Sequence, residues 1–383
     1  MGTTPMAFKL NTFSVIAPLL IGGLSIADGA DVTGSTTLFF AEGAETNPAG
    51  PNQIDTTITI DPSGGLPPTY SASDSTLIIN EPGSNPVNYS RVDIDLTIDA
   101  VNDNVVSFSL ANGRFYQSDT KFAGGNPFYY TFEFNFEGIS STIYTHGPRS
   151  LISNPATGEY SSADHTRITD TGILSGWTKA GSLGQKEYIT PRDFSVEPSG
   201  GPGNGTGNIT LSRTSTVNGL ITYEITMQEV VDVYDVQVDE NGGQFITDSD
   251  GIILATGTIV VGETPYLNWT LIEGITGANP NDDHNADGVE NLIAWAMGLG
   301  ANDNAKRHLP KANADGSFTI DLPVTGTASD ILIQTSSDLA SWSTLTPGRC
   351  SLGANPMPAG SANTVSITPS GQKTEFIRFM VTE

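Results

Sequence analysis

The chain is poor in cysteine, in positive charge and in long apolar runs. Cys350 is its single cysteine, so a framework of disulfide bonds within the chain is excluded. Lysine and arginine together number 16, against 42 aspartate and glutamate residues, which gives a formal net charge of −26. Because a field of that sign repels phosphate groups, nucleic acids and anionic membrane surfaces are not expected as partners.

The one sizeable apolar run lies near the N-terminus. It extends from Phe13 to Ile26, follows Lys9, and ends at the small residues of Ser25-Ile-Ala27. This succession is typical of a secretory signal peptide, and the run is shorter than the roughly 20 residues that span a bilayer. We therefore expect residues 1–27 to be removed on export; a buried strand or an uncleaved anchor is the alternative interpretation. No other segment is apolar enough to cross a membrane, so the mature chain is expected to be secreted or held at the cell surface, without a transmembrane segment.

Helical periodicity is scarce as well. Charged residues make up only 15% of the chain, whereas glycine and proline number 42 and 23, a balance that favours short strands and turns. Arg91 to Asp99 alternates apolar and polar residues, as a half-buried strand does. Phe128 to Phe136 places five aromatic rings on one face, and we expect that face to be core, because an exposed row would invite aggregation. Further strands are predicted at Thr56–Ile60, Val105–Leu110, Leu220–Met227, Val230–Val238 and Gly251–Gly262.

These patterns predict an all-β protein. Its main domain is expected to be an antiparallel β-sandwich or jelly roll, followed by one short helix and a small C-terminal β module. Residues 147–215 are expected to be irregular, and the helix is predicted from Val289 to Leu299, where Gly300 ends it. The predicted boundaries are 1–27 for the signal peptide, 28–271 for the main domain, 272–304 for an acidic loop with the helix, and 305–383 for the C-terminal module.

Catalytic signatures are missing. The chain contains no G-x-S-x-G, H-E-x-x-H, P-loop or C-x-x-C pattern. His146 and His165 are the only histidines of the main domain, and with Lys179, Lys186 and Tyr188 they supply the acid, base and cation that a polysaccharide lyase needs. A cleft lined by His146, Arg149, His165 and Tyr188 would favour such an enzyme. No spacing ties these four residues together, and residues of surface loops would look the same. Catalysis there is therefore the alternative hypothesis, and no organic cofactor is predicted.

Aromatic residues in loops are candidates for stacking against sugar rings, which requires an exposed ring face near polar groups. The candidates are Tyr116, Tyr129, Tyr144, Tyr160 and Trp177. Packing inside the protein is the competing interpretation for each of them.

An oxygen-rich loop precedes the predicted helix. Asp283, Asn285 and Asp287 stand at alternate positions, Gly288 supplies a turn, and Asn291 follows three residues later. Alternate positions on a tight loop converge their oxygens, which is how calcium loops of the D-x-[DN]-x-[DN]-G kind hold the ion. The predicted ligands are Asp283, Asn285, Asp287, the carbonyl oxygen of Val289 and, through water, Asn291. A metal-free turn in which Asp287 caps the helix is the alternative.

The same residues carry a family resemblance. The run from Asp283 to Leu299 resembles the calcium-loop junction of secreted bacterial proteins of the Planctomycetes–Verrucomicrobia group, and its loop is similar to thrombospondin type 3 and dockerin loops. In those proteins a β module follows, and Ile331–Trp342 and Glu375–Glu383 resemble two of its strands. The resemblance covers about the last hundred residues and implies calcium. Ala294 stands where the family has the bidentate glutamate, so any calcium affinity is expected to be weak.

The sequence as a whole predicts an exported, non-catalytic protein of the cell surface or exterior. A structural, adhesive or glycan-binding role is expected, with extracellular glycans or cell-surface components as partners. The alternative is an extracellular polysaccharide-degrading enzyme, a lyase or glycoside hydrolase, on a jelly-roll scaffold.

Overall fold

The computed structural model describes residues 8–9, 12–14, 31–61, 69–203, 205–238, 244–309, 311–315, 317–321, 330–338, 340–351, 353, 355, 364–368, 370–371 and 376–382. Two compact units emerge from the packing. The strand-rich unit comprises Thr33–Ser215 and Thr222–Val260, and the C-terminal unit comprises Met1–Val32, Thr216–Ile221 and Val261–Glu383. The predicted signal peptide lies outside the described residues, apart from the short strands β1 (Phe8–Lys9) and β2 (Thr12–Ser14).

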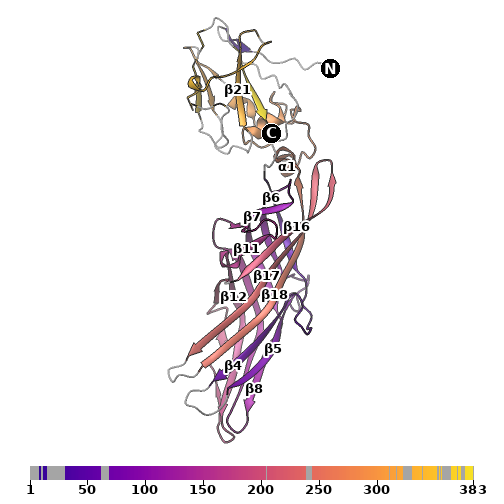
Figure 1. The fold of residues 1–383 in the computed structure, drawn as a ribbon, viewed down its shortest axis with the longest axis vertical. Helices are drawn as coiled ribbons and strands as arrows, with labels where there is room; N and C mark the ends of the chain where they lie inside the picture. Colours follow the sequence, from indigo (N-terminus) through magenta and orange to yellow (C-terminus); the bar gives the residue numbers. More distant parts are fainter. Residues whose placement is uncertain are drawn as a thin grey trace. The chain divides into compact units, whose positions relative to one another are not determined.

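Antiparallel strands form the strand-rich unit (Figure 1). They are β3 (Val32–Phe40), β4 (Gln53–Asp61), β5 (Tyr70–Ile79), β6 (Arg91–Asp99), β7 (Asn104–Gln117), β8 (Thr120–Asn126), β9 (Tyr130–Thr145), β10 (Ser150–Leu151), β11 (Glu159–Ser161), β12 (His165–Ala180), β13 (Lys186–Tyr188), β14 (Arg192–Asp193), β15 (Ser199–Pro202), β16 (Thr206–Val217), β17 (Leu220–Val238) and β18 (Gln244–Gly262). This confirms the predicted all-β, sandwich-like class. The finer assignment of a jelly roll stays a prediction.

The main sheet curls so that its two ends approach each other. Its strand order is β11-β16-β17-β18-β3-β6-β7-β9-β12-β13, with β15 added on β12. Only the short 3-10 turn η1 (Ser162–Asp164) separates β11 from β12 in the chain, yet β11 pairs with β16 at the other end of the order. Gly207 permits this pairing, because a Cβ atom there would lie 2.2 Å from the ring of Tyr160. The sheet therefore encloses an interior space.

The predicted alternation of β6 is confirmed. Its apolar residues Val92, Ile94, Leu96 and Ile98 are at most 1% exposed, whereas the residues between them are intermediate or exposed. The aromatic face of β9 is likewise confirmed for Phe132 and Phe134, which are buried in one cluster with β4 and β8 residues, while Tyr130 and Phe136 are partly buried against it. The prediction is wrong for Phe128, which is 74% exposed. Phe128 lies in the turn between β8 and β9, where the alternation of a strand no longer fixes the direction of a side chain.

The expectation that residues 147–215 are irregular is wrong. This region contains the sixteen-residue strand β12, which pairs with β9 along its length, and the strand β16. Hydrophobic alternation is faint in β12 because its inward positions include His165, Arg167 and Thr169, which are polar. The predicted strands Leu220–Met227 and Val230–Val238 form one continuous strand, β17.

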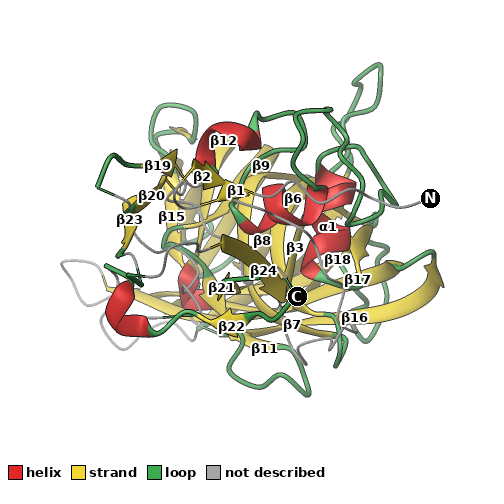
Figure 2. Cartoon of the chain, turned by 90° about the horizontal axis from the view of Figure 1, so that it is seen from above, coloured by secondary structure: helices red, strands yellow, loops and turns green. Residues whose placement is uncertain are grey.

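The C-terminal unit packs its helices and its small sheets around one core. Its elements are α1 (Pro265–Ile272), α2 (Asn291–Ala296), the 3-10 turns η2 (Ala305–His308) and η3 (Pro347–Arg349), and strands β19 (Lys311–Ala312), β20 (Phe318–Asp321), β21 (Asp330–Ser336), β22 (Ser343–Thr344), β23 (Thr364–Ile367) and β24 (Phe376–Thr382). Figure 2 shows how small the helical share is. In the part of the chain that the structure describes, no helix combines the length and the apolar character that crossing a membrane requires.

Two details of this unit differ from the prediction. The predicted helix Val289–Leu299 is shorter, from Asn291 to Ala296, and the helix α1 was not expected. Thr264 caps α1 by accepting the N–H of Leu267, and Pro265 opens it. Its buried residues Tyr266, Asn268 and Thr270 fall at every second position, so the sequence lacks the 3.6-residue period of an amphipathic helix. The finer division at residues 271 and 304 stays a prediction.

Candidate functional site

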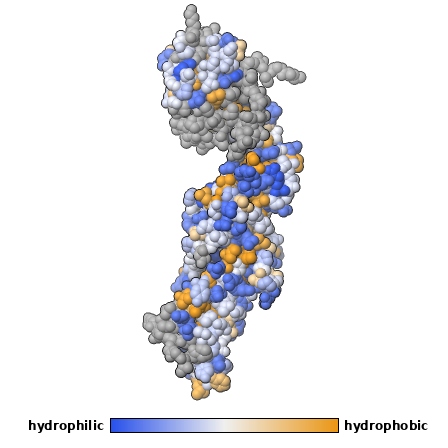
Figure 3. All heavy atoms as spheres, viewed as in Figure 1, coloured by the Kyte–Doolittle hydropathy of each residue, from blue (hydrophilic) through white to orange (hydrophobic). Residues whose placement is uncertain are grey.

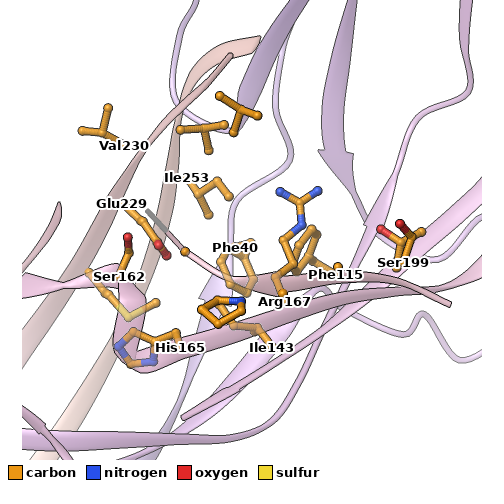
Figure 4. A pocket seen from close by; sticks show the side chains of 18 residues that line it. Phe40, Phe115, Ile143, Ser162, His165, Arg167, Ser199, Glu229, Val230 and Ile253 are labelled. Atoms are coloured by element: carbon orange, nitrogen blue, oxygen red, sulfur yellow. The ribbon is translucent and has the colours of Figure 1, made fainter. Parts of the chain in front are cut away.

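An interior cavity of about 430 Å³ lies in the strand-rich unit (Figure 4). Its walls come from β12, β15 and β17, together with residues of β3, β7, β9 and β18. Most lining side chains are apolar: Phe40, Phe115, Ile143, Met227, Val230, Val231, Val233 and Ile253. The polar ones are few and specific: Ser162, His165, Arg167, Thr169, Ser199 and Glu229. A cavity of this size with few convergent polar groups is the usual form of a small-molecule site.

Strand register places Arg167 inside this cavity. Alternate residues of β12 point to the same face of the sheet, so His165, Arg167 and Thr169 all face inward. Arg167 stands opposite Ile143 of β9 and opposite Gly201 of β15, and paired residues share a face. Gly201 contributes no side chain, so the space above the Arg167 stem stays open.

The Arg167 guanidinium has no acceptor among the residues that the structure describes. Among the described residues, none forms a hydrogen bond or an ion pair with it, and its one specific contact is the Phe115 ring, 4.9 Å from Cζ to the ring centroid. Arg114 shows the contrast, because its Nη1 lies 3.0 Å from both carboxylate oxygens of Asp170. Burial lowers the pKa of Arg167, with Glu229 opposing that shift. None of its nitrogen atoms is fully buried without a partner, so its five donors stay accessible to an acceptor that enters the cavity.

Glu229 is the acidic group of the same cavity. Burial raises its pKa to about 7, and the charge of Arg167 and a hydrogen bond from Ser162 act against that rise. In the view of Figure 4, the carboxyl group lies beside Ser162, away from the Arg167 guanidinium, with Phe40 between them. Near neutral pH the group is therefore divided between its neutral and charged forms.

His165 is held in place on both sides. Its Nε2 lies 3.1 Å from Ser150 Oγ and its Nδ1 lies 3.2 Å from Thr145 Oγ1, while the ring stacks on Phe108 at 5.2 Å. Burial lowers its pKa to about 4, with Asp164 opposing that shift. Because its imidazole is neutral and both its nitrogens are bonded to hydroxyl groups, His165 has a structural role in the cavity wall.

A second cavity of about 270 Å³ adjoins the first. The two share Arg167, Thr169, Val231 and Val233 as lining residues. The β17 side of the first cavity reaches the surface, because Val230 is 48% and Val233 is 37% exposed. Hydrophobic side chains form several patches on the surface of this unit, drawn orange in Figure 3.

Comparison with known proteins adds no assignment. No family model matches this chain, and no curated protein sequence gives a significant match. The site must therefore be judged on its own geometry.

The structure does not gather the four residues of the catalytic hypothesis. His165 lines the cavity, but His146 is exposed, with its Nδ1 3.0 Å from Thr166 Oγ1. Arg149 donates to Ser107 Oγ at 3.0 Å and to a backbone carbonyl. Tyr188 is 74% exposed on β13. Of these four, only His165 is a cavity residue.

The aromatic residues proposed for glycan stacking are divided. Tyr160 is 1% exposed and packs on Phe108 at 4.9 Å, so the competing interpretation of packing inside the protein holds for this residue. Trp177 is partly buried, and Lys186 Nζ lies 3.6 Å from its ring centroid, so one ring face is already covered. Tyr129 and Tyr144 are 58% and 39% exposed, and Tyr116 is partly buried.

Sequence reasoning missed the two charged groups of the cavity, Arg167 and Glu229. One signal was present: Tyr223, Ile225 and Met227 alternate inward on β17, and Glu229 continues their series. A charged residue at an inward position of a strand has to be paired or functional, because its desolvation is costly.

In the C-terminal unit, the predicted calcium loop forms a series of tight turns. Ala286 and Gly288 have φ values of 56° and 89°, which turn the chain back on itself. Asp283 Oδ1 and Asn285 Oδ1 both accept the Asp287 N–H at 3.1 Å, so these two oxygens converge. Asp287 itself accepts the N–H groups of Val289 at 2.8 Å and Ala305 at 2.5 Å.

The loop fits a cation in part. Asp283 and Asn285 present neighbouring oxygens, whereas the Asp287 carboxylate is turned toward backbone N–H groups. Asn291 is buried, and its Oδ1 accepts the His284 N–H at 3.1 Å. Within the described ranges, no group of three or more His, Cys, Asp or Glu side chains is arranged to hold a metal ion. A full coordination shell would therefore need backbone carbonyls and water.

Proposed function

We propose that this protein is an exported, non-catalytic binding protein that holds a small ligand in the interior cavity of its strand-rich unit. The observation that carries the proposal is the Arg167 guanidinium, which faces an apolar cavity and has no acceptor among the described residues. Export rests on the signal-peptide pattern of residues 1–27.

Binding is better supported than catalysis. A general acid or base has to reach the reacting atoms and exchange a proton with them. His165 has both ring nitrogens bonded to hydroxyl groups, and His146, Arg149 and Tyr188 lie outside the cavity. The alternative, a polysaccharide-degrading enzyme, is therefore less well supported, because few of its candidate catalytic groups line the cavity.

The lining also bears on the kind of ligand. A glycan needs many hydrogen-bonding partners, whereas this cavity offers a largely apolar wall with a small polar cluster. An apolar body with one polar group matches that wall better than a sugar does.

A pair of glycine substitutions tests the proposal. A Cβ atom at Gly201 meets nothing within 4 Å, and the residue shares the inward face of Arg167, so Gly201→Leu fills the cavity without a backbone clash. Gly147 also has open space but does not line the cavity, which makes Gly147→Leu the matched control. The probe is the neutral dye N-phenyl-1-naphthylamine, whose fluorescence rises in apolar sites. We expect saturable binding to the wild type and to Gly147→Leu, and a loss of at least tenfold in Gly201→Leu. Equal binding by all three, or by none, contradicts the proposal.

The C-terminal unit is a second candidate site. Its loop binds Ca²⁺ weakly through Asp283, Asn285, Asp287 and the Val289 carbonyl, with Asn291 acting through water. The shared position of the Asp283 and Asn285 oxygens supports this assignment. The missing glutamate at Ala294 accounts for a low affinity.

A further inference from the structure

We propose that the ligand of this cavity is a small amphipathic carboxylate that binds Arg167, and that the charge of Glu229 controls its affinity. This inference rests on the proposed function and specifies its ligand. It follows from three features of the cavity: the position of the cation, the shape of the apolar wall, and the acid that shares the space.

The cation selects for a planar anion. A guanidinium presents parallel N–H donors that match a carboxylate in a bidentate pair, and such charge-assisted bonds are the strongest of their kind. Arg167 is the cavity residue that is always charged, and its Cζ lies 4.9 Å from the centroid of the Phe115 ring. One cation balances one negative charge, so a monoanion fits better than a phosphate dianion.

The rest of the wall selects for an apolar body. Ile143 and Phe115 flank the guanidinium, and Met227, Val231 and Ile253 line the space beyond it. The adjoining 270 Å³ cavity shares Arg167 and extends the apolar path through Phe122, Phe136 and Phe245. A ligand anchored at Arg167 can therefore place an alkyl or aryl body in either cavity.

The charge of Glu229 acts against the binding of an anion in the same cavity. When its carboxyl group is neutral, the cavity carries one uncompensated positive charge and attracts an anion. When the group is ionised, it neutralises Arg167 at a distance and repels a second carboxylate. Burial raises the pKa of Glu229 to about 7, which places this change at neutral pH.

Three ionisable groups that line or adjoin the cavity beside Glu229 keep one charge state across this range. On β12 these are Arg167, which stays protonated, and His165, whose pKa is lowered to about 4. On β11, burial and the charge of Glu229 raise the pKa of Tyr160 well above its ordinary value, so the phenol stays neutral. Asp164 of η1 acts electrostatically on His165. The segment of β15 that lines the cavity, residues 199–202, carries no ionisable side chain.

The experiment compares decanoate with decanol by isothermal titration calorimetry on the full chain. Decanoate is ionised throughout the range from pH 6 to 8.5, and decanol has the same chain without the charge. If the ligand binds only when Glu229 is neutral, the Kd for decanoate should rise about 30-fold across that range, since the pKa is about 7. The Kd for decanol should stay constant within twofold.

Two substitutions separate the roles of the charged groups. Glu229→Gln should keep decanoate binding and reduce its pH dependence to less than twofold. Arg167→Met has a similar volume, and it should weaken decanoate binding at least tenfold at pH 6 while leaving decanol unchanged. Circular dichroism checks folding, and should Arg167→Met not fold, Arg167→Lys carries the test, with an intermediate loss expected because it keeps the charge without the planar fork.

The outcomes are distinguishable. Equal affinity for decanoate and decanol, unchanged by Arg167→Met, overturns the carboxylate assignment and leaves the cavity as a binding site. A pH dependence that persists in Glu229→Gln overturns the role of Glu229. Absence of binding for decanoate, decanol and the neutral dye overturns the proposed function itself.

Discussion

The aromatic face of β9 provides a quantitative test of the core. Phe132 is 1% exposed, and its ring lies 5.6 Å from that of Phe134 between ring centroids. Gly124 stands opposite on β8, where a Cβ atom would lie 3.0 Å from Phe132 Cζ, so the ring covers a position without a side chain. Phe132→Ala therefore leaves a void next to Gly124, which has no side chain to fill it.

The expected cost follows from two contributions. Burial of a phenylalanine side chain contributes roughly 1.5–3 kcal/mol, and the unfilled void adds a further cost, so truncation in a core typically destabilises by about 3–5 kcal/mol. We expect the upper half of that range, because Gly124 has no side chain that could move into the gap. For a domain of this size, 1 kcal/mol shifts the melting temperature by about 2–4 °C, so the loss should reach about 8–20 °C.

The assay is urea unfolding of the full chain, followed by hydrogen-exchange mass spectrometry of peptides from β8 and β9. This readout assigns the transition to the strand-rich unit. Phe128→Ala is the matched control, because Phe128 is 74% exposed in the adjacent turn and should change stability by less than about 0.5 kcal/mol. Equal effects of the two substitutions, or an unchanged midpoint for Phe132→Ala, would refute the assignment of this face to the core.

Three further predictions concern charge, metal and a turn. The pKa of Glu229 is higher in the folded state than in the unfolded state, so its contribution to stability falls as pH rises from about 4.5 to 7, by about 2–3 kcal/mol at most. Glu229→Gln should remove that pH dependence of stability in thermal melts. Glu224→Gln, which changes an exposed residue of the same strand, should retain it. Ala294→Glu should lower the melting temperature without calcium, because Ala294 is 6% exposed and the larger charged side chain has to be buried. The same substitution should enlarge the stabilisation by 10 mM calcium relative to Ala294→Gln. Identical responses of the two variants to calcium would contradict the assignment of a calcium site. Asp103 accepts hydrogen bonds from Tyr223 Oη at 2.6 Å and from Arg213 Nε at 2.9 Å. Asp103→Asn, which is compatible with the φ of 56° at this position, should lower the free energy of unfolding in urea titrations by about 1–2 kcal/mol. A change below about 0.5 kcal/mol would contradict a stabilising role for these two hydrogen bonds.

The fold was predictable wherever one face of a strand is apolar. β6 follows its predicted bounds from Arg91 to Asp99, because alternation alone fixes which side chains enter the core. β12 was missed for the opposite reason: its inward residues line a cavity and are polar, so the hydrophobic period vanishes where the site lies. α1 was missed because its buried residues recur at every second position, which mimics a strand.

The candidate site was less predictable than the fold. The chemistry of an imidazole favours His165 as the functional residue, yet both its ring nitrogens are bonded within the cavity wall. Arg167, two positions later, carries the charge that has no acceptor among the described residues. His165 and Arg167 differ in the residues that contact them, which come from β7, β9, β10 and β17. No spacing in the sequence indicates that these strands meet at the cavity. The predicted calcium loop is the converse case, because all its candidate ligands lie within one short segment of the sequence.

The curled sheet has a consequence for how the cavity comes into being. Phe40 of β3 and Ile253 of β18 line the same space, and Phe40 pairs with Ala255 across more than two hundred residues of chain. During vectorial synthesis on a ribosome, the wall is incomplete until β18 has emerged, so the pocket cannot act as an early nucleus. High contact order of this kind slows folding and leaves unpaired edges exposed meanwhile. The proposed binding site is thus a late product of folding, and no contiguous fragment that stops short of β18 can contain it.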